Sequence, residues 1–415
     1  MIYETSYDSG HKPFSPDLKR GKWDKPTDYI FACFGLALKL DIFVASYWFF
    51  FDMGIFGMLP YLVYMVIYLV PIMVIHSFMG QFSSSGFISA FRLSPFFKGM
   101  GYVSVFLTIA MLIYYSIFAA VPLLFMINSF RPTLPWSCEG FKLWYNESDG
   151  RKTTCNMTIS EDLKGIEGSF DLQVLTHWTL FLSSATALSS LGWPNLWTFI
   201  YYTMLLMAAL IVITTQIFTV LQSLFDEFEI LRVRKQEVTF GLIGGIAVCS
   251  FYFCTNHGIT FFAALGLDAI FSHSLLHLLL LLVVLWIYGR ERFQRDIEFM
   301  LGQPFASWKI FILRFIAPII LILCLVLGIF VCYMEHSYTS PIVLGISIVL
   351  VILPMMAIPG YGIYYIYRST GSFCERFKRT CRPTDWYPVE MEHRQQYEEA
   401  VSNTDMTQQL TAVPN

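Results

Sequence analysis

Eight stretches of this chain are apolar for long enough to cross a membrane as helices. A helix rises about 1.5 Å per residue, so about 20 residues cover the roughly 30 Å of hydrocarbon in a bilayer. The stretches lie at residues 29–50, 56–79, 101–128, 194–224, 238–256, 268–288, 308–333 and 342–367. Polar segments separate them, and the pattern therefore predicts an all-α polytopic membrane protein with about eight transmembrane helices.

Composition supports the same class of protein. Of the 415 residues, 56% are hydrophobic and 14% are charged, whereas a soluble domain carries about 25% charged residues. The basic residues form short clusters between apolar stretches, which is typical of membrane topology and not of a nucleic-acid surface. We therefore expect the lipid bilayer as a partner and no nucleic acid.

The distribution of basic residues predicts which loops face the cytosol. Lys and Arg are absent from 51–55, 257–267 and 334–341, and they occur in 81–99, 225–237, 289–307 and both terminal segments. The positive-inside rule then places both termini in the cytosol. The predicted regions are a cytosolic N-terminal tail (1–27), a transmembrane domain (28–368) and a cytosolic C-terminal tail (369–415). The polar end of the chain is expected to be disordered.

One long polar loop, 129–193, has features of an extracellular segment. Asn146-Glu147-Ser148 and Asn156-Met157-Thr158 both fit the acceptor pattern for N-glycosylation, which implies modification at Asn146 and Asn156. The same loop contains Cys138 and Cys155, and a cysteine pair in an extracellular loop predicts a disulfide. These features predict a multi-pass glycoprotein whose loop 129–193 lies on the lumenal or extracellular side of the membrane.

A set of motifs, ordered along the chain, resembles the neurotransmitter sodium symporter family. The stretch from Trp286 to Gly302 is similar to the segment after the family's tenth span. Other landmarks are Arg20 to Trp23, Pro60-Tyr61, Gly80-Gln81, Lys98 to Tyr102, Leu134 to Trp136, Leu188 to Trp197, Asp226-Glu227-Phe228 and Trp308-Lys309. The resemblance implies sodium-coupled import of a small amino-acid-like or amine solute, with sodium, and in the family also chloride, as coupling ions.

The resemblance also implies that the family's fourth to seventh spans are missing. Residues 171–175 resemble the end of the long outer loop, and residues 179–191 already resemble the approach to the eighth span. About 20 residues cannot hold four membrane helices. The expected fold is thus an incomplete inverted-repeat symporter. An alternative function is a transport-inactive family member that acts as an interaction or regulatory protein, in a homo-oligomer or with full-length relatives. A third interpretation is an unrelated eight-span channel.

The candidate site residues follow from the resemblance and from charges within apolar stretches. Tyr115 matches the family's tyrosine that contacts substrate, although a packed core tyrosine is the alternative. Lys39 and Asp41 are ionisable residues in the first span, which indicates either a substrate site or a structural pair. The family's sodium-ligand position holds Ile42, so no metal site is assigned on these residues.

Other motifs do not indicate catalysis. His273 and His277 are four residues apart and suggest either metal or proton chemistry or an interfacial role, and a lone His76 occupies the position of a family glutamate. The chain lacks Walker A, His-Glu-x-x-His and Gly-x-Ser-x-Gly motifs. We therefore expect neither an enzyme nor an organic cofactor.

We predict that glycosidase treatment of the chain expressed in cells increases its gel mobility, because N-linked glycans add bulk to an extracellular loop. The double substitution Asn146→Gln and Asn156→Gln should abolish this shift. If the enzyme leaves the mobility of the unsubstituted chain unchanged, loop 129–193 faces the cytosol and the predicted topology is wrong.

Overall fold

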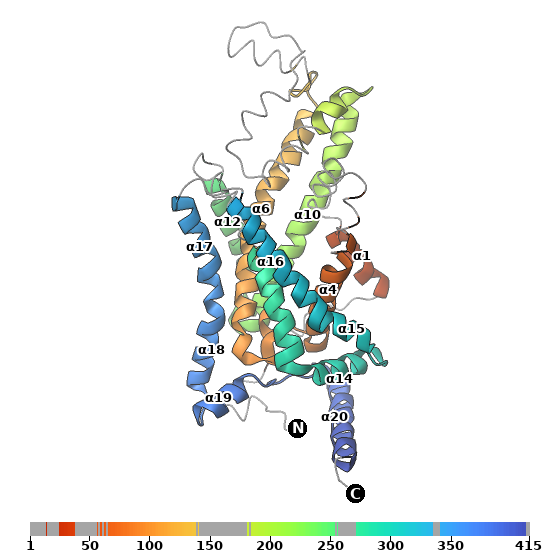
Figure 1. The fold of residues 1–415 in the computed structure, drawn as a ribbon. Coiled ribbons are helices and arrows are strands. Elements are labelled where there is room, and N and C mark those ends of the chain that lie inside the picture. The colour runs from red at the N-terminus through yellow and green to blue at the C-terminus, as the bar shows by residue number, and fades with distance from the viewer. Residues whose placement is uncertain are drawn as a thin grey trace.

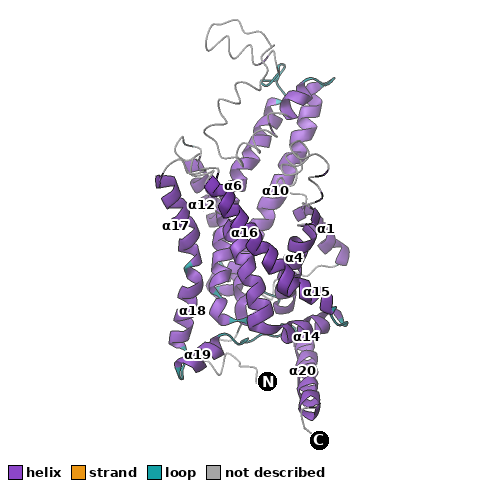
Figure 2. Ribbon diagram, in the orientation of Figure 1, coloured by secondary structure: helices purple, strands orange, loops and turns teal. Residues whose placement is uncertain are grey.

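The structure, a computed structural model, describes residues 25–37, 65–137, 184–253, 271–334 and 341–411, with Phe14 and a few other isolated positions. Every regular element in these ranges is a helix (Figure 2). The long helices run side by side as a bundle (Figure 1). Helices satisfy their backbone groups internally, which hydrocarbon requires, and the prediction of an all-α polytopic membrane protein is confirmed.

Five helices in the described ranges are long and apolar enough to cross a membrane. They are Pro95–Asn128, Pro194–Glu227, Lys235–Phe253, Phe271–Leu301 and Ser307–Leu327. Each coincides with a predicted stretch. The first contains α6 (Gly99–Asn128), and the next two correspond to α10 (Pro194–Glu227) and α12 (Lys235–Phe253).

The other three predicted stretches are described in part or as shorter helices. The first contains α1 (Pro26–Ala37), and the second ends in η1 (Met65–Leu69) and α4 (Val70–Ser83). The remainder of both stretches lies largely outside the described residues. The last stretch consists of α17 (Pro341–Met355) and α18 (Ala357–Arg368), which lie end to end (Figure 1).

Two prolines flank the boundary between α17 and α18 at Met356. Pro354 lies inside α17 and cannot donate to the carbonyl of Leu350, and Pro359 cannot donate to the carbonyl of Met355. Regular bonding continues beside Met356, since Met356 N donates to Ile352 O at 3.0 Å and Gly360 N donates to Met356 O at 3.0 Å. The chain therefore keeps its direction across Met356 with two helical bonds fewer.

Helices α6 and α10 form a long antiparallel pair in the bundle (Figure 1). Aromatic residues fill the contact, with the rings of Phe125 and Tyr202 stacked at 4.6 Å and an interplanar angle of 12°. Tyr202 also donates to the carbonyl of Phe181 at 2.6 Å, so its hydroxyl is satisfied although the side chain is buried. Tyr115 lies on α6. Helix α10 ends in Asp226 and Glu227, far from the contact between Phe125 and Tyr202.

One pole of the bundle carries the basic loops, and we call it the basic end. It is formed by α5 (Phe87–Ala90), η2 (Phe91–Leu93), η3 (Pro95–Phe97), α11 (Glu229–Val233), α14 (Arg290–Leu301), α15 (Ser307–Phe311) and α19 (Phe373–Thr380). Arg92 lies over the ring of Phe14 at 3.6 Å and donates to the carbonyl of Asp385 at 3.0 Å. Phe14 and the C-terminal segment are therefore at the same pole.

The C-terminal tail differs from the prediction of disorder. Residues beyond the last span form α19, which begins with a capping box between Ser372 and Glu375, and α20 (Met391–Thr411). Trp386 is 1% exposed and Tyr397 is 2% exposed. The expectation was wrong because two large aromatic side chains anchor a segment whose average composition is polar.

Close packing at the basic end depends on glycine. A Cβ on Gly101 would lie 2.6 Å from the Cα of Ile88 in α5, and a ring carbon of Phe96 lies 2.7 Å from the Cβ position of Gly362 in α18. Real Cβ atoms do not approach a backbone atom so closely. The absence of a side chain at Gly101 therefore allows α5 to contact α6 directly.

We predict that Gly101→Ala lowers the free energy of unfolding by about 1–3 kcal/mol, because the added methyl group overlaps the α5 backbone. Thermal unfolding of the purified protein in detergent would measure the change. Gly80→Ala is the matched control: Gly80 also lies inside a helix, and no neighbouring atom lies within 4 Å of its Cβ position. Equal effects of the two substitutions would contradict the packing argument.

Candidate functional site

Most of the residues proposed from sequence for binding or modification lie outside the described residues. These are Lys39, Asp41, Ile42, Cys138, Cys155, Asn146 and Asn156. Their proposed roles in solute binding, sodium ligation, disulfide formation and glycosylation therefore stay predictions. Among the site residues, Tyr115 is the one that the structure describes.

Tyr115 lies on α6 and is buried, with 3% of its side chain exposed. Its ring meets that of Tyr114 edge-on at 6.0 Å, and Tyr114 in turn contacts Phe118 at 4.7 Å. The side chain is part of a packed aromatic region, so a solute can reach it only after neighbouring side chains move.

The structure places His76, which the sequence analysis treated as a lone histidine, beside the pair His273 and His277. The ring of His76, from α4, meets the ring of His277 at 5.5 Å, and His277 lies 6.3 Å from His273. His76 also contacts Phe87 at 5.2 Å. His76 is therefore not isolated. Among the described residues, no group of three or more His, Cys, Asp or Glu side chains has the arrangement of a metal site.

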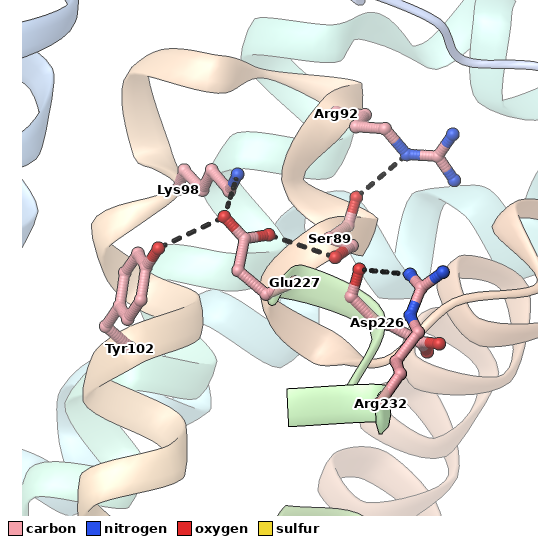
Figure 3. A network of polar contacts seen from close by, with 7 residues as sticks. All are labelled: Ser89, Arg92, Lys98, Tyr102, Asp226, Glu227 and Arg232. Carbon is pink, nitrogen blue, oxygen red and sulfur yellow. Dashed lines mark hydrogen bonds and ion pairs between the residues drawn. The ribbon is translucent and has the colours of Figure 1, made fainter. Parts of the chain in front are cut away.

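The densest polar cluster lies at the basic end, where α10 terminates (Figure 3). Glu227, its last residue, accepts hydrogen bonds from Lys98 Nζ at 2.5 Å, Tyr102 OH at 3.1 Å and Ser89 Oγ at 3.0 Å. A carboxylate at a helix C-terminus opposes the helix dipole, and the Lys98 ammonium offsets that unfavourable interaction. Glu227 thus joins the end of α10 to α5 and to the start of α6.

Asp226, the preceding residue, holds the loop that enters α5. Its Oδ2 accepts from the backbone N–H of Gly86 at 2.5 Å, and its Oδ1 accepts from Gln222 Nε2 at 3.0 Å. Gly86 must be small, because a Cβ there would lie 2.5 Å from the Cα of Ser223. Arg232 folds back and donates to the carbonyls of Phe225 and Asp226 at 2.5 and 3.0 Å, which satisfies terminal carbonyls of α10.

Arg92 connects this cluster to the C-terminal segment. Its three side-chain nitrogens donate to the carbonyls of Ser89, Asp385 and Ser83, each at 3.0 Å. Thr384 N donates in return to the Arg92 carbonyl at 2.9 Å. Burial lowers the pKa of Arg92 to about 10, so the guanidinium stays charged at neutral pH. The carbonyl dipoles replace the hydration that this cation loses.

A cleft of about 500 Å³ opens among these segments and is lined by Phe14, Arg92, Lys98, Glu227, Tyr361 and Arg368, among others. Its walls carry cations and carboxylates together. When segments joined by polar contacts separate, water replaces each lost hydrogen bond, so the net free-energy cost is modest. Water cannot replace the contacts between packed apolar helices in this way. The arrangement therefore has the chemistry of a reversible closure at one pole of the bundle.

The sequence analysis identified several members of this cluster as landmarks without predicting their contacts. Lys98, Tyr102, Asp226 and Glu227 all belonged to the quoted motifs. A local signal existed, because Lys98 and Tyr102 are four residues apart and share a helical face. The roles of Arg92 and Ser89 were missed, since Arg92 donates to Asp385, 293 residues away, and Ser89 donates to Glu227, 138 residues away.

The fold and this junction define a multi-pass, all-α membrane protein closed at one pole by a polar cluster. A comparison with protein families matches residues 20–170 and 176–369 to the sodium:neurotransmitter symporter family. The chain belongs to this family, which confirms the resemblance drawn from sequence. The two matched parts are separated by residues 171–175, which the sequence analysis interpreted as the end of the long outer loop.

Curated relatives match parts of the chain. The sodium- and chloride-dependent neutral and basic amino acid transporter B(0+) of Mus musculus is 30% identical over 146 residues, 34% of this chain and 22% of the relative. Glycine transporter 2 of Xenopus laevis is 30% identical over 223 residues, 52% and 28% of the two chains. The sodium-dependent acetylcholine transporter of Caenorhabditis elegans is 32% identical over 123 residues, 28% and 17%. The matches span less than a third of the length of each of these relatives.

We predict that Lys98 and Glu227 are energetically coupled by about 1–3 kcal/mol, because their side chains are only 20% and 14% exposed. A double-mutant cycle with Lys98→Met and Glu227→Gln, followed by thermal unfolding, would measure this coupling. Arg234 and Glu237 are the matched control: they also form an ion pair, at 3.4 Å, but are 72% and 70% exposed. Their coupling should be close to zero, and equal coupling in both pairs would contradict the prediction.

Proposed function

We propose that this chain is a sodium-coupled symporter-family protein that imports a small amino-acid-like or amine solute across the plasma membrane, with both termini in the cytosol. The family match over both parts of the chain is the observation that carries the proposal. The relatives' names include transporters of amino acids, glycine, creatine, acetylcholine and GABA, which supports a small solute without selecting one.

The polar cluster at the basic end fits a transport cycle. Symporters of this architecture expose a central site alternately to the two sides of the membrane. In the proposed cycle, the contacts of Glu227 with Lys98, Tyr102 and Ser89 close the cytosolic side and separate when solute leaves. Tyr115 contacts the solute from α6. Sodium, and chloride as in the relatives' names, are the proposed coupling ions.

A second candidate function is that of a transport-inactive partner for full-length relatives. Specific residues favour it: Ile42 occupies the sodium-ligand position, and Ile211 and Val212 occupy the polar pair of the eighth span in the alignment by motif. The proposed loss of the fourth to seventh spans points the same way. In this alternative, the chain forms a homo- or hetero-oligomer and regulates it.

Uptake measurements decide between these functions. We expect sodium-dependent uptake from a labelled amino-acid and amine panel by cells that express the chain, with surface biotinylation to count molecules at the plasma membrane. Surface protein without uptake would contradict import and support the inactive partner.

For an active chain, we expect Tyr115→Phe to lower uptake about three- to tenfold at equal surface expression, because one hydrogen bond contributes roughly 0.5–1.5 kcal/mol. Tyr114→Phe is the matched control, since Tyr114 is the adjacent buried tyrosine. Equal losses in the two variants would assign Tyr115 to packing and not to solute contact.

A further inference from the structure

The C-terminal segment is attached to the bundle by a few buried side chains. We call residues 381–401 the docked segment. Trp386, Tyr397 and Val401 are 1%, 2% and 6% exposed. Most other side chains from 391 to 401 are exposed, and α20 projects away from the bundle (Figure 1). The attachment is therefore concentrated at discrete anchors and not spread along the helix.

The anchors enter an aromatic socket formed by α4 and by the chain on either side of Gly289. Trp386 stacks on Phe82 at 5.1 Å and lies 6.0 Å from Phe78. Tyr397 meets Phe82 edge-on at 5.3 Å and Phe299 at 5.1 Å. These rings belong to one continuous apolar cluster that also includes Phe293 and Ile297 of α14.

A buried carboxylate lies at the centre of this apolar socket. Asp296 of α14 is 0% exposed and accepts from Tyr288 OH, from Trp386 Nε1 at 3.2 Å and from Tyr397 OH at 2.8 Å. Arg295 Nε lies 3.6 Å from its Oδ1. Two of its three hydrogen-bond donors thus come from the docked segment. A carboxylate inside an apolar cluster is stable only while such partners remain.

The helix that carries Asp296 is bounded by two glycines in unusual conformations. Gly289, before α14, has φ of +105°, and Gly302, after it, has φ of +66°. Glycine adopts these angles without steric cost, and a Cβ at either position would meet no atom within 4 Å. Both glycines therefore serve the backbone turn and not the packing. Helix α14 is thus bounded at each end by a turn at a glycine.

Only one face of α14 is buried, and it is narrow. Phe293, Asp296 and Ile297, spaced at i, i+3 and i+4, are its buried residues. The docked segment covers Asp296 and contacts the neighbouring rings. The docked segment thus contributes two hydrogen bonds and two aromatic rings to the buried face of α14. We infer that these contacts help to hold α14 in its position between Gly289 and Gly302.

We propose that α14 is a hinged lever at the basic end, and that the docked segment holds it in place through Asp296. When the segment leaves, Asp296 loses two donors and must turn towards water, which rotates α14 about Gly289 and Gly302. The lever joins the span that ends in η4 (Val283–Gly289) to the span that begins at Ser307. Release of the tail therefore moves the inner ends of two spans. This inference does not depend on whether the chain transports a solute.

The test is hydrogen–deuterium exchange of the full chain in lipid nanodiscs, read by mass spectrometry. The double variant Trp386→Phe and Tyr397→Phe keeps an aromatic ring at both positions, although a phenyl replaces the larger indole at 386, and it removes both tail donors to Asp296. It also removes the hydrogen bond of 3.5 Å that Tyr397 OH accepts from Arg295. We expect amide exchange in residues 290–301 to become at least tenfold faster, with exchange in α6 and α10 unchanged. Gln396→Ala is the matched control, because Gln396 is exposed and adjacent to Tyr397 on α20, and it should leave exchange in 290–301 unaltered.

A third substitution tests the role of the carboxylate. Adding Asp296→Asn to the double variant removes a buried charge that has lost two of its three hydrogen-bond donors, so exchange in 290–301 should slow again by at least threefold. Three outcomes would overturn the proposal: faster exchange in α20 alone, which would make the tail a passive attachment; a general increase that includes α6 and α10, which would make it a global stabiliser; or no recovery with Asp296→Asn.

Discussion

Hydrocarbon offers no hydrogen-bond partners, and the arrangement of this protein depends on that constraint. The helices satisfy their own backbone groups along the bundle, and in the part of the chain that the structure describes, side-chain bonds between distant segments gather at the basic end. Glu227 is the clearest case, because it accepts hydrogen bonds from Lys98, Tyr102 and Ser89 at the C-terminal end of α10. Arg92 and Asp296 extend the same principle to the C-terminal segment. The helices form the bundle, and the contacts of Glu227, Arg92 and Asp296 join segments that are distant in sequence at its basic end.

The fold was predictable where its cause is local. Helices α6 and α10 follow from long apolar runs, whose length alone determines that they cross a membrane. The docked segment was not predictable, because its burial rests on Trp386 and Tyr397 within a polar sequence. Composition averages over such anchors and therefore indicated disorder. The break at Met356 has a local cause in Pro354 and Pro359, but a proline in a membrane span is tolerated often enough that the sequence alone did not divide the span.

The sequence identified several residues of the polar cluster as members of motifs, but it did not predict which of them contact one another. Lys98 and Glu227 both stood in motifs that resemble the family, but 129 residues separate them, and no periodicity links positions so far apart. Asp296 belonged to a charged loop in which burial was not visible. His76 was interpreted as isolated because its neighbour His277 comes from a distant helix. Lys39, Asp41 and the cysteines of the long loop stay predictions.

The division of the last span at Met356 has a mechanical consequence. A continuous helix resists bending along its whole length because each turn is tied to the next, whereas a rod with two ties missing is compliant at that point. Helix α18, on one side of it, is fixed by the contact of Gly362 with Phe96. Helix α17 is joined to α18 through the compliant point and also packs against α6. A displacement of α17 by the surrounding lipid can therefore bend the span at Met356, so that less of the motion reaches α18 and the basic end.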